Sequence, residues 1–113
     1  MKLPNADDAL AGPAKVRDYL LAAEHPTGRG KARFFSALGF TRANWVELQR
    51  ALEGLAREGD AVPGPANRFG QKHIVRGLIE GPNGRAAQVA SVWIILHAGT
   101  RPRLLTAYPG GPS

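Results

Sequence analysis

Residues 1–13 show little periodicity, whereas apolar positions recur with helical spacing over residues 14–24. The pattern predicts a helix over residues 14–24, with Pro13 in its first turn, where a missing N–H costs nothing. His25-Pro26 ends this helix, because proline disfavours helical geometry at the residue before it. The positions expected to face the core are Val16, Leu20 and Ala23, with Tyr19 beside them.

Two further helices are predicted before residue 60. One runs from about Arg29 to Leu38 and stops at Gly39, which suits a left-handed helix end. The other starts at Thr41 as N-cap and closes at Gly59. Its apolar stripe is Trp45, Leu48, Leu52 and Leu55, with Phe40 packed on Trp45 as a hydrophobic staple.

After residue 60 the pattern changes from helical to β-like. Residues 60–70 are rich in proline and glycine and are interpreted as a connector. Strands are expected at residues 71–80, 87–96 and 103–108, separated by the turns Gly81-Pro82-Asn83-Gly84 and His97-Ala98-Gly99-Thr100. The segment 87–96 is apolar on both alternating faces, as expected of a central strand.

Helices first and antiparallel strands second indicate an α+β fold. We expect N-terminal helices packed on an antiparallel sheet of three or more strands. A length of 113 residues favours one domain, which we place at residues 1–109, followed by a disordered tail at residues 110–113.

Composition narrows the choice of partners and compartments. The chain carries 15 Lys and Arg against 9 Asp and Glu, a net charge of +6. Such an excess fits nucleic acid, an acidic protein or anionic lipid, and also the arginine-rich composition of a GC-rich genome. Cysteine is absent, which excludes disulfides and fits the cytoplasm. No apolar run approaches a membrane span, so no membrane association is expected.

The densest chemistry lies between His25 and Phe35. His25 precedes a Pro-Thr-Gly turn and can exchange a proton near neutral pH. Arg29 and Arg33 share one helical face, and Lys31 lies near the helix start, where free N–H groups attract anions. These residues fit a phosphate site with a proton carrier beside it. They fit equally an ordinary basic helix face with a capping histidine.

The last expected strand carries two hydroxyls. Strict alternation would put Leu104, Thr106 and Tyr108 on one face, and Arg103 could join them only from the strand end or after a bulge. Thr106 and Tyr108 are suited to binding a phosphate oxygen, although both residue types are also common in strands.

Other motifs suggest no cofactor and no metal. Gly81 to Arg85 is glycine-rich but matches neither a Walker loop nor a dinucleotide motif, and reads as a hairpin turn with an exposed Arg85. The three histidines lie at 25, 73 and 97 and lack metal-ligand spacing.

Several motifs together resemble a widespread bacterial family of small uncharacterised domains. The resemblance covers almost the whole chain but implies no established activity. The matching segments are Pro4-Asn5-Ala6-Asp7, His25-Pro26-Thr27-Gly28-Arg29-Gly30-Lys31-Ala32-Arg33, Phe69-Gly70, Gly81-Pro82-Asn83-Gly84-Arg85 and Pro102-Arg103-Leu104-Leu105-Thr106-Ala107-Tyr108-Pro109.

More distantly, the order of elements resembles the toxin ribonucleases that group barnase, EndoU, the colicin ribonucleases and RelE. That resemblance implies metal-independent RNA cleavage through attack by the 2′-hydroxyl. It would make His25 the general acid or base and Lys31 the group that stabilises the transition state. Thr106, helped by Tyr108, would bind the scissile phosphate, and the RNA backbone would be held by Arg29, Arg33, Arg85 and Arg103.

The leading hypothesis is therefore a bacterial ribonuclease-like toxin that acts on RNA and is paired with an acidic antitoxin or immunity protein. The alternative is a non-catalytic basic adaptor that binds an acidic protein or nucleic acid. The sequence does not specify the RNA target, the inhibitor or the oligomeric state.

Overall fold

The computed structural model describes residues 1–22 and 29–110. Short helical turns come first: η1 (Ala6–Asp8, 3-10), α1 (Pro13–Lys15) and η2 (Val16–Leu20, a π-helical turn). The two longer helices follow, α2 (Arg29–Ser36) and α3 (Trp45–Glu58). The strands complete the fold: β1 (Asp60–Ala66), β2 (Gly70–Glu80), β3 (Ala86–Leu96) and β4 (Arg103–Pro109).

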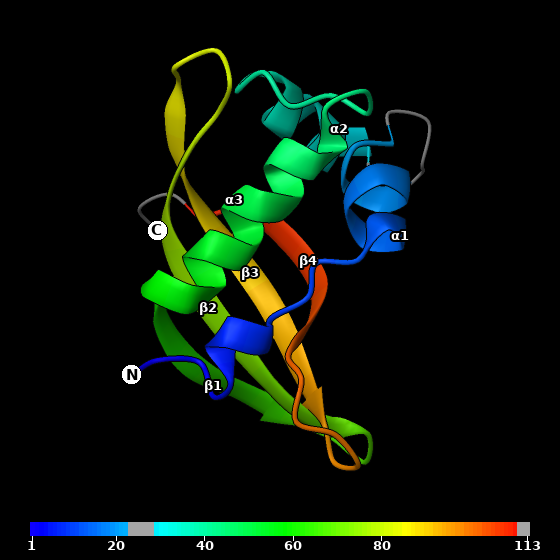
Figure 1. The fold of residues 1–113 in the computed structure, drawn as a ribbon, viewed down its shortest axis with the longest axis vertical. Coiled ribbons are helices and arrows are strands. Elements are labelled where there is room, and N and C mark those ends of the chain that lie inside the picture. Colours follow the sequence, from blue (N-terminus) through cyan, green and yellow to red (C-terminus); the bar gives the residue numbers. More distant parts are fainter. Residues whose placement is uncertain (23–28, 111–113) are drawn as a thin grey trace.

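The four strands form one antiparallel sheet in the order β1-β2-β3-β4. Helix α3 lies across one face of this sheet and contacts β2, while α2 lies at one end and contacts β4 (Figure 1). The predicted α+β fold, with helices packed on an antiparallel sheet, is confirmed.

The hydrophobic core fills the space between α3 and the sheet. Leu48, Leu52 and Leu55 supply one side from α3, and Val75 and Trp93 supply the other from β2 and β3. One polar network lies inside the core. The Ser91 hydroxyl donates to the carbonyl of Val75 at 2.8 Å and accepts from the indole Nε1 of Trp93 at 2.8 Å.

Two helix predictions need correction. The helix expected over residues 14–24 is an α-helical turn at Pro13–Lys15 that continues as the π-helical turn η2 to Leu20, although Pro13 does occupy the first turn. Helix α3 begins at Trp45 rather than after Thr41. Thr41 and Asn44 instead close a tight turn, because each side-chain oxygen accepts a hydrogen bond from the other residue's backbone N–H.

The largest error concerns residues 60–70, which are not a loop. Residues 60–66 form β1, the outer strand next to β2. Pro63 and Pro65 are tolerated there because one side of an edge strand needs no N–H donors. The register shifts between Pro63 and Ala66, which accommodates this irregular composition.

The other expected elements are confirmed within two residues. Helix α2 buries Ala32 and Phe35, with Leu38 buried just beyond its end, and Gly39 has the left-handed φ of 95°. Strands β2, β3 and β4 occupy the expected segments, and β3 is central.

The β2–β3 turn is attached to the segment that follows α2. Asn83 donates from its backbone N–H to the Leu38 carbonyl at 3.4 Å and from Nδ2 to the Ala37 carbonyl at 3.0 Å. Gly81 permits this contact, because a Cβ at that position would overlap the Leu38 carbonyl. The turn that carries Arg85 is thereby held next to the end of α2.

Candidate functional site

A bulge in β4 decides which side chains share a face. Val92 pairs with Thr106, but the next residue, Trp93, pairs with Leu104, so Leu105 is the extra residue. Such a bulge reverses the alternation on one side of the insertion. Leu104 therefore faces the core opposite Trp93, and its expected place beside Thr106 and Tyr108 was wrong.

The same bulge aligns Arg103 with the two hydroxyl residues. Arg103 pairs with Ile94, while Thr106 and Tyr108 pair with Val92 and Ala90. These three β3 residues alternate with Ser91 and Trp93, which face the core, so they lie on the opposite side of the sheet. Arg103, Thr106 and Tyr108 consequently share that face, which we call the outer face.

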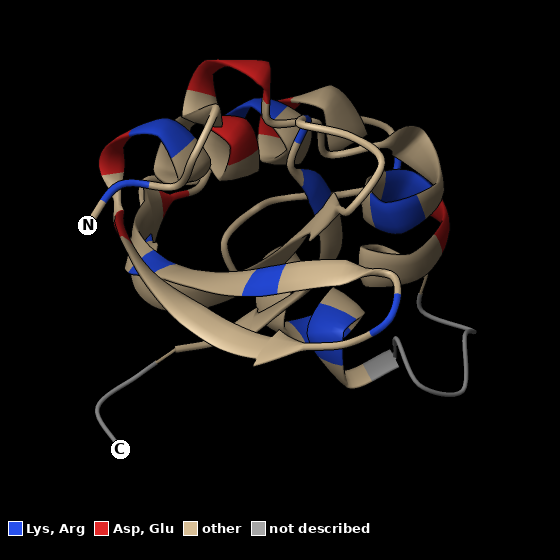
Figure 2. Cartoon of the chain, turned by 90° about the horizontal axis from the view of Figure 1, so that it is seen from below, with Lys and Arg blue, Asp and Glu red and all other residues tan. Residues whose placement is uncertain are grey.

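The outer face also receives basic side chains from β2. Lys72 pairs with Ile94, which places it in one row with Arg103. Arg76 pairs with Ala90, in one row with Tyr108 and, on the other side, with Asp60 of β1. In Figure 2 the acidic segments lie mainly on the side of η1 and α3, whereas the strands carry mostly Lys and Arg. On the outer face Lys72, Arg76 and Arg103 thus outnumber Asp60 and Glu80.

Thr106 is chemically unusual within this face. The residue is half-buried, and its Oγ1 is shielded from solvent and has no hydrogen-bond partner among residues 1–22 and 29–110. A buried hydroxyl that lacks a partner costs free energy, commonly about 1–3 kcal/mol. A hydroxyl retained at this cost, on a cationic face, marks Thr106 as a candidate ligand-binding residue.

The other predicted site residues lie on elements around β4. Lys31 is half-buried in α2, Arg33 is exposed on the same helix, and Arg29 is its first residue. Arg85 is exposed in the turn that contacts the end of α2. Because α2 contacts β4, the structure brings together the elements that carry Lys31 and Thr106. His25 lies outside the described residues, so its position remains a prediction.

A cluster of cations and aromatic rings adjoins α2 and was not predicted from the sequence. Lys15 Nζ and Lys31 Nζ both lie over the Tyr19 ring, 5.8 and 5.5 Å from its centroid. Arg17 lies over the ring of Trp45 at 5.6 Å. These distances are within the range of cation–π attraction. We call Lys15, Arg17, Tyr19, Lys31 and Trp45 the cation–aromatic cluster.

The carboxylate of Asp18 lies at the surface beside this cluster. Asp18 is bound by Arg17 at 2.8 Å and by Arg42 at 3.3 Å. The hydrogen bond from Arg17 is the main cause that lowers the pKa of Asp18 below its ordinary value, and the charges of Arg17 and Arg42 act in the same direction. One carboxylate thus orients two guanidinium groups at the surface. Only the spacing of basic and aromatic residues over 15–19 could have signalled this arrangement in the sequence.

The described residues offer no group of three His, Cys, Asp or Glu side chains suited to a metal ion. His73 is buried, and burial lowers its pKa, while a hydrogen bond with the Gln71 backbone opposes that shift. His97 is exposed, and its Nε2 lies 2.9 Å from the Asn67 carbonyl. None of the described helices is both long and apolar enough to cross a membrane.

Comparison with known protein families assigns this chain to one of them. A family model described as a domain of unknown function, DUF6883, matches residues 2–111. The chain belongs to the DUF6883 family. The predicted membership of a family of uncharacterised domains is therefore confirmed. No curated protein matches the DUF6883 chain.

A solved structure shares the fold of this DUF6883 domain. It is described as a contact-dependent growth inhibition toxin–immunity protein complex from Klebsiella pneumoniae 342. The TM-score is 0.72 at 15% sequence identity, and the match covers 95% of this chain and 97% of that one. At this identity the similarity shows a common fold.

Proposed function

We propose that the protein is a toxin-like ribonuclease that cleaves RNA without a metal ion. The observation that carries this proposal is the bulge at Leu105, which sets Arg103 beside Thr106 and Tyr108 on a cationic face. Helix α2, with Lys31 and Arg33, contacts the same strand. The fold shared with a chain of a toxin–immunity complex supports a role in such a system.

The proposed chemistry uses each residue type in its ordinary role. The 2′-hydroxyl attacks the adjacent phosphorus, a new P–O bond forms, and the bond to the 5′-oxygen breaks. His25 either takes the proton of the 2′-hydroxyl as general base or protonates the departing 5′-oxygen as general acid, and water carries the other proton. Lys31 neutralises charge that builds up on the phosphate oxygens, and Thr106 and Tyr108 donate hydrogen bonds to them. The flanking backbone phosphates are held by Arg29, Arg33, Arg85 and Arg103.

The buried state of Thr106 adds one requirement. Its Oγ1 is shielded from solvent, so a phosphate oxygen cannot reach it in the conformation described. Rotation about χ1 between staggered positions would exchange the hydroxyl with another substituent of Cβ. We expect substrate binding to drive this rotation, because the hydroxyl then gains the hydrogen bond that it lacks.

The test is RNA cleavage by the purified full chain in EDTA. His25→Ala should lower the cleavage rate by about 10²–10⁴-fold, the usual contribution of a general acid or base. His97→Ala is the matched control and should leave the rate unchanged, because His97 is exposed near Asn67, in a loop outside the proposed site. Both variants should keep the wild-type melting temperature. Failure of the wild-type protein to cleave any cellular RNA, or full activity of His25→Ala, would refute the enzyme proposal.

A second candidate function is favoured by the cation–aromatic cluster. Two lysines on one tyrosine ring, next to an arginine on a tryptophan, form a surface suited to carboxylates of an acidic protein partner. In this reading the protein is a non-catalytic adaptor. Lys15→Ala should then weaken binding of the partner and reduce its dependence on salt, whereas His25→Ala should have no effect.

A further inference from the structure

Strand β2 continues past the end of its outer neighbour. The pairing between β1 and β2 ends where Asp60 meets Arg76, because the chain before Asp60 turns into α3. Gly77–Glu80 pairs with β3 on one side only. Among residues 1–22 and 29–110, no strand pairs with its other side. This four-residue edge therefore presents backbone N–H and C=O groups at alternate positions.

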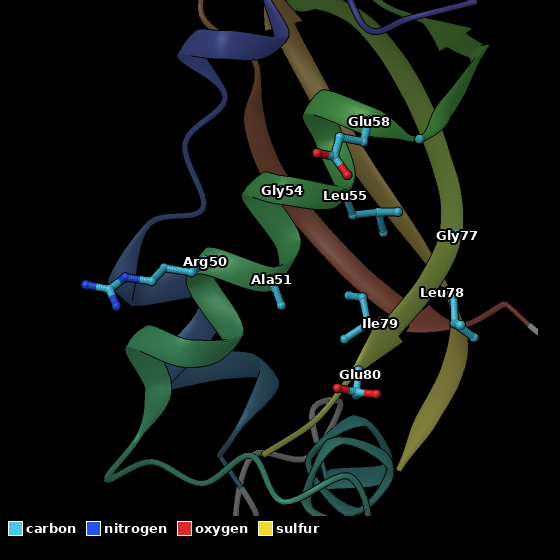
Figure 3. A pocket seen from close by; sticks show the side chains of 10 residues that line it. Arg50, Ala51, Gly54, Leu55, Glu58, Gly77, Leu78, Ile79 and Glu80 are labelled. Carbon is cyan, nitrogen blue, oxygen red and sulfur yellow. The ribbon is translucent and has the colours of Figure 1, made fainter. Parts of the chain in front are cut away.

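A groove of about 400 Å³ runs along this open edge. Its walls are Gly77–Glu80 of β2 and the α3 residues Arg50, Gly54, Leu55 and Glu58 (Figure 3). Leu78 and Ile79 both line it, although successive strand residues point to opposite faces. The groove consequently follows the edge of the strand rather than one face of the sheet. Leu78 is 64% exposed beside it.

The two outer strands of the sheet are protected over part of their length. The Ala61 N–H of β1 donates to the Met1 carbonyl at 2.7 Å, and Pro63 and Pro65 remove donors further along. At the opposite edge, Leu10 forms a parallel bridge with Arg103 at the start of β4. Coverage and proline are common means of preventing strands from pairing with other chains. Gly77–Glu80 has neither of them.

We propose that this edge binds an extended, basic segment of another protein, which pairs with β2 as an additional strand. Backbone groups of Gly77–Glu80 would supply the hydrogen bonds, as in β-strand addition. An apolar side chain of the segment would pack against Leu78. The charge preference follows from the groove lining, where the carboxylates of Glu58 and Glu80 outnumber the one cation, Arg50, although the chain has a net charge of +6.

Charge also distinguishes this partner from a second copy of the chain. Two copies paired through the same edge would bring Glu58 and Glu80 of both molecules into one shared groove. Opposed like charges destabilise an interface. A foreign segment with Lys or Arg neutralises the same carboxylates instead.

The probe for this proposal is a library of random ten-residue peptides displayed on phage and selected on the full wild-type chain. We expect the selected peptides to alternate apolar and polar positions and to carry Lys or Arg. A synthetic consensus peptide should bind with measurable fluorescence anisotropy and shift the backbone amide resonances of Gly77–Glu80.

Gly54→Leu fills the groove and is the decisive variant. A Cβ at Gly54 meets only the Arg57 Nη2 atom, at 3.9 Å, and leucine favours the helix over glycine. The variant should fold with an equal or higher melting temperature and lose at least about tenfold in peptide affinity, equivalent to 1.4 kcal/mol. Glu80→Lys should weaken binding too. Glu47→Lys, which makes the same charge change on α3 away from the groove, should not.

Several results would overturn the proposal. They are a selection that yields no peptide, resonance shifts outside Gly77–Glu80, and unchanged affinity of Gly54→Leu. Concentration-dependent dimerisation of the wild-type chain that Gly54→Leu abolishes would also overturn it, because the occupant of the edge would then be a second copy. Ribonuclease activity should be unaffected by Gly54→Leu, so failure here is distinguishable from failure of the enzyme proposal.

Discussion

The face of the sheet that packs against α3 and the outer face are built from alternate residues of the same strands. Each holds a buried polar atom without a hydrogen-bond partner, Nδ1 of His73 on the α3 side and Oγ1 of Thr106 on the outer side. His73 is in register with Trp93 within the core, whereas Thr106 shares its face with Arg103 and Lys72.

The two atoms differ in which groups could become their missing hydrogen-bond partners. His73 is 5% exposed and lies in register with the buried Trp93, so we expect its unpaired atom to affect stability. Thr106 is half-buried on a cationic face, where an anion could supply the missing hydrogen bond. These comparable defects predict pH-sensitive stability for His73 and mark Thr106 as a candidate ligand-binding residue.

The largest effect should come from a polar group in the core that does have partners. Ser91→Ala removes the hydroxyl that joins the Val75 carbonyl to the Trp93 indole. The Trp93 indole N–H would be left buried and unpaired, while the Val75 carbonyl would keep its place in the β2–β3 ladder, so we expect a loss of about 2 kcal/mol in the free energy of unfolding. Urea denaturation measures it. Ser36→Ala, which removes an exposed hydroxyl bound to Arg33, should change stability by less than about 0.5 kcal/mol. If Ser91→Ala and Ser36→Ala changed the free energy of unfolding equally, the hydrogen bonds of Ser91 would make no net contribution to stability.

The second effect depends on pH. Burial lowers the pKa of His73, so the unfolded chain, with a histidine pKa of about 6.5, binds the proton more readily than the folded chain. Stability should be constant above about pH 7 and fall as the pH decreases below about 6.5, until the lowered folded pKa is passed. His73→Gln should reduce this dependence.

The control for this pH dependence is His97→Gln. His97 is exposed, so the variant should retain the full loss of stability in acid. Urea denaturation between pH 5 and pH 8 compares the three proteins, with the interval set by the ordinary histidine pKa. If the stability of His73→Gln depends on pH as that of the wild-type protein does, the acid sensitivity arises from other groups. The proposed role of His73 would then be wrong.

Much of the fold could be predicted because local patterns and tertiary structure agree. Helices α2 and α3 and strands β2, β3 and β4 follow hydrophobic periodicity, and Gly39 and Gly59 mark helix ends. Strand β1 was missed because Pro63 and Pro65 indicate a loop, and only its place at the sheet edge makes them acceptable.

The site was less predictable, because it depends on register. The bulge at Leu105 has no glycine or other signal in the sequence, yet it decides that Arg103 rather than Leu104 lies beside Thr106. The stacking of Lys15 and Lys31 on Tyr19 joins segments on either side of residues 23–28. Such contacts between distant segments cannot be inferred from local spacing.

The smallest effect on stability should come from Thr106, and it is the one that best separates the two faces. Thr106→Val keeps the β-branched shape and removes only the unpaired hydroxyl, so stability should be unchanged or rise by up to about 1 kcal/mol. Thr106→Ser keeps the hydroxyl and loses a methyl group, so stability should fall by about 1 kcal/mol. If Thr106 binds phosphate, the order reverses for function: Thr106→Ser should retain RNA binding and cleavage, and Thr106→Val should lose them. Melting curves and filter-binding measurements on both variants provide the comparison. Should Thr106→Val be both stable and active, the unpaired hydroxyl would be only a packing defect, and the outer face would lose its strongest claim to be the binding site.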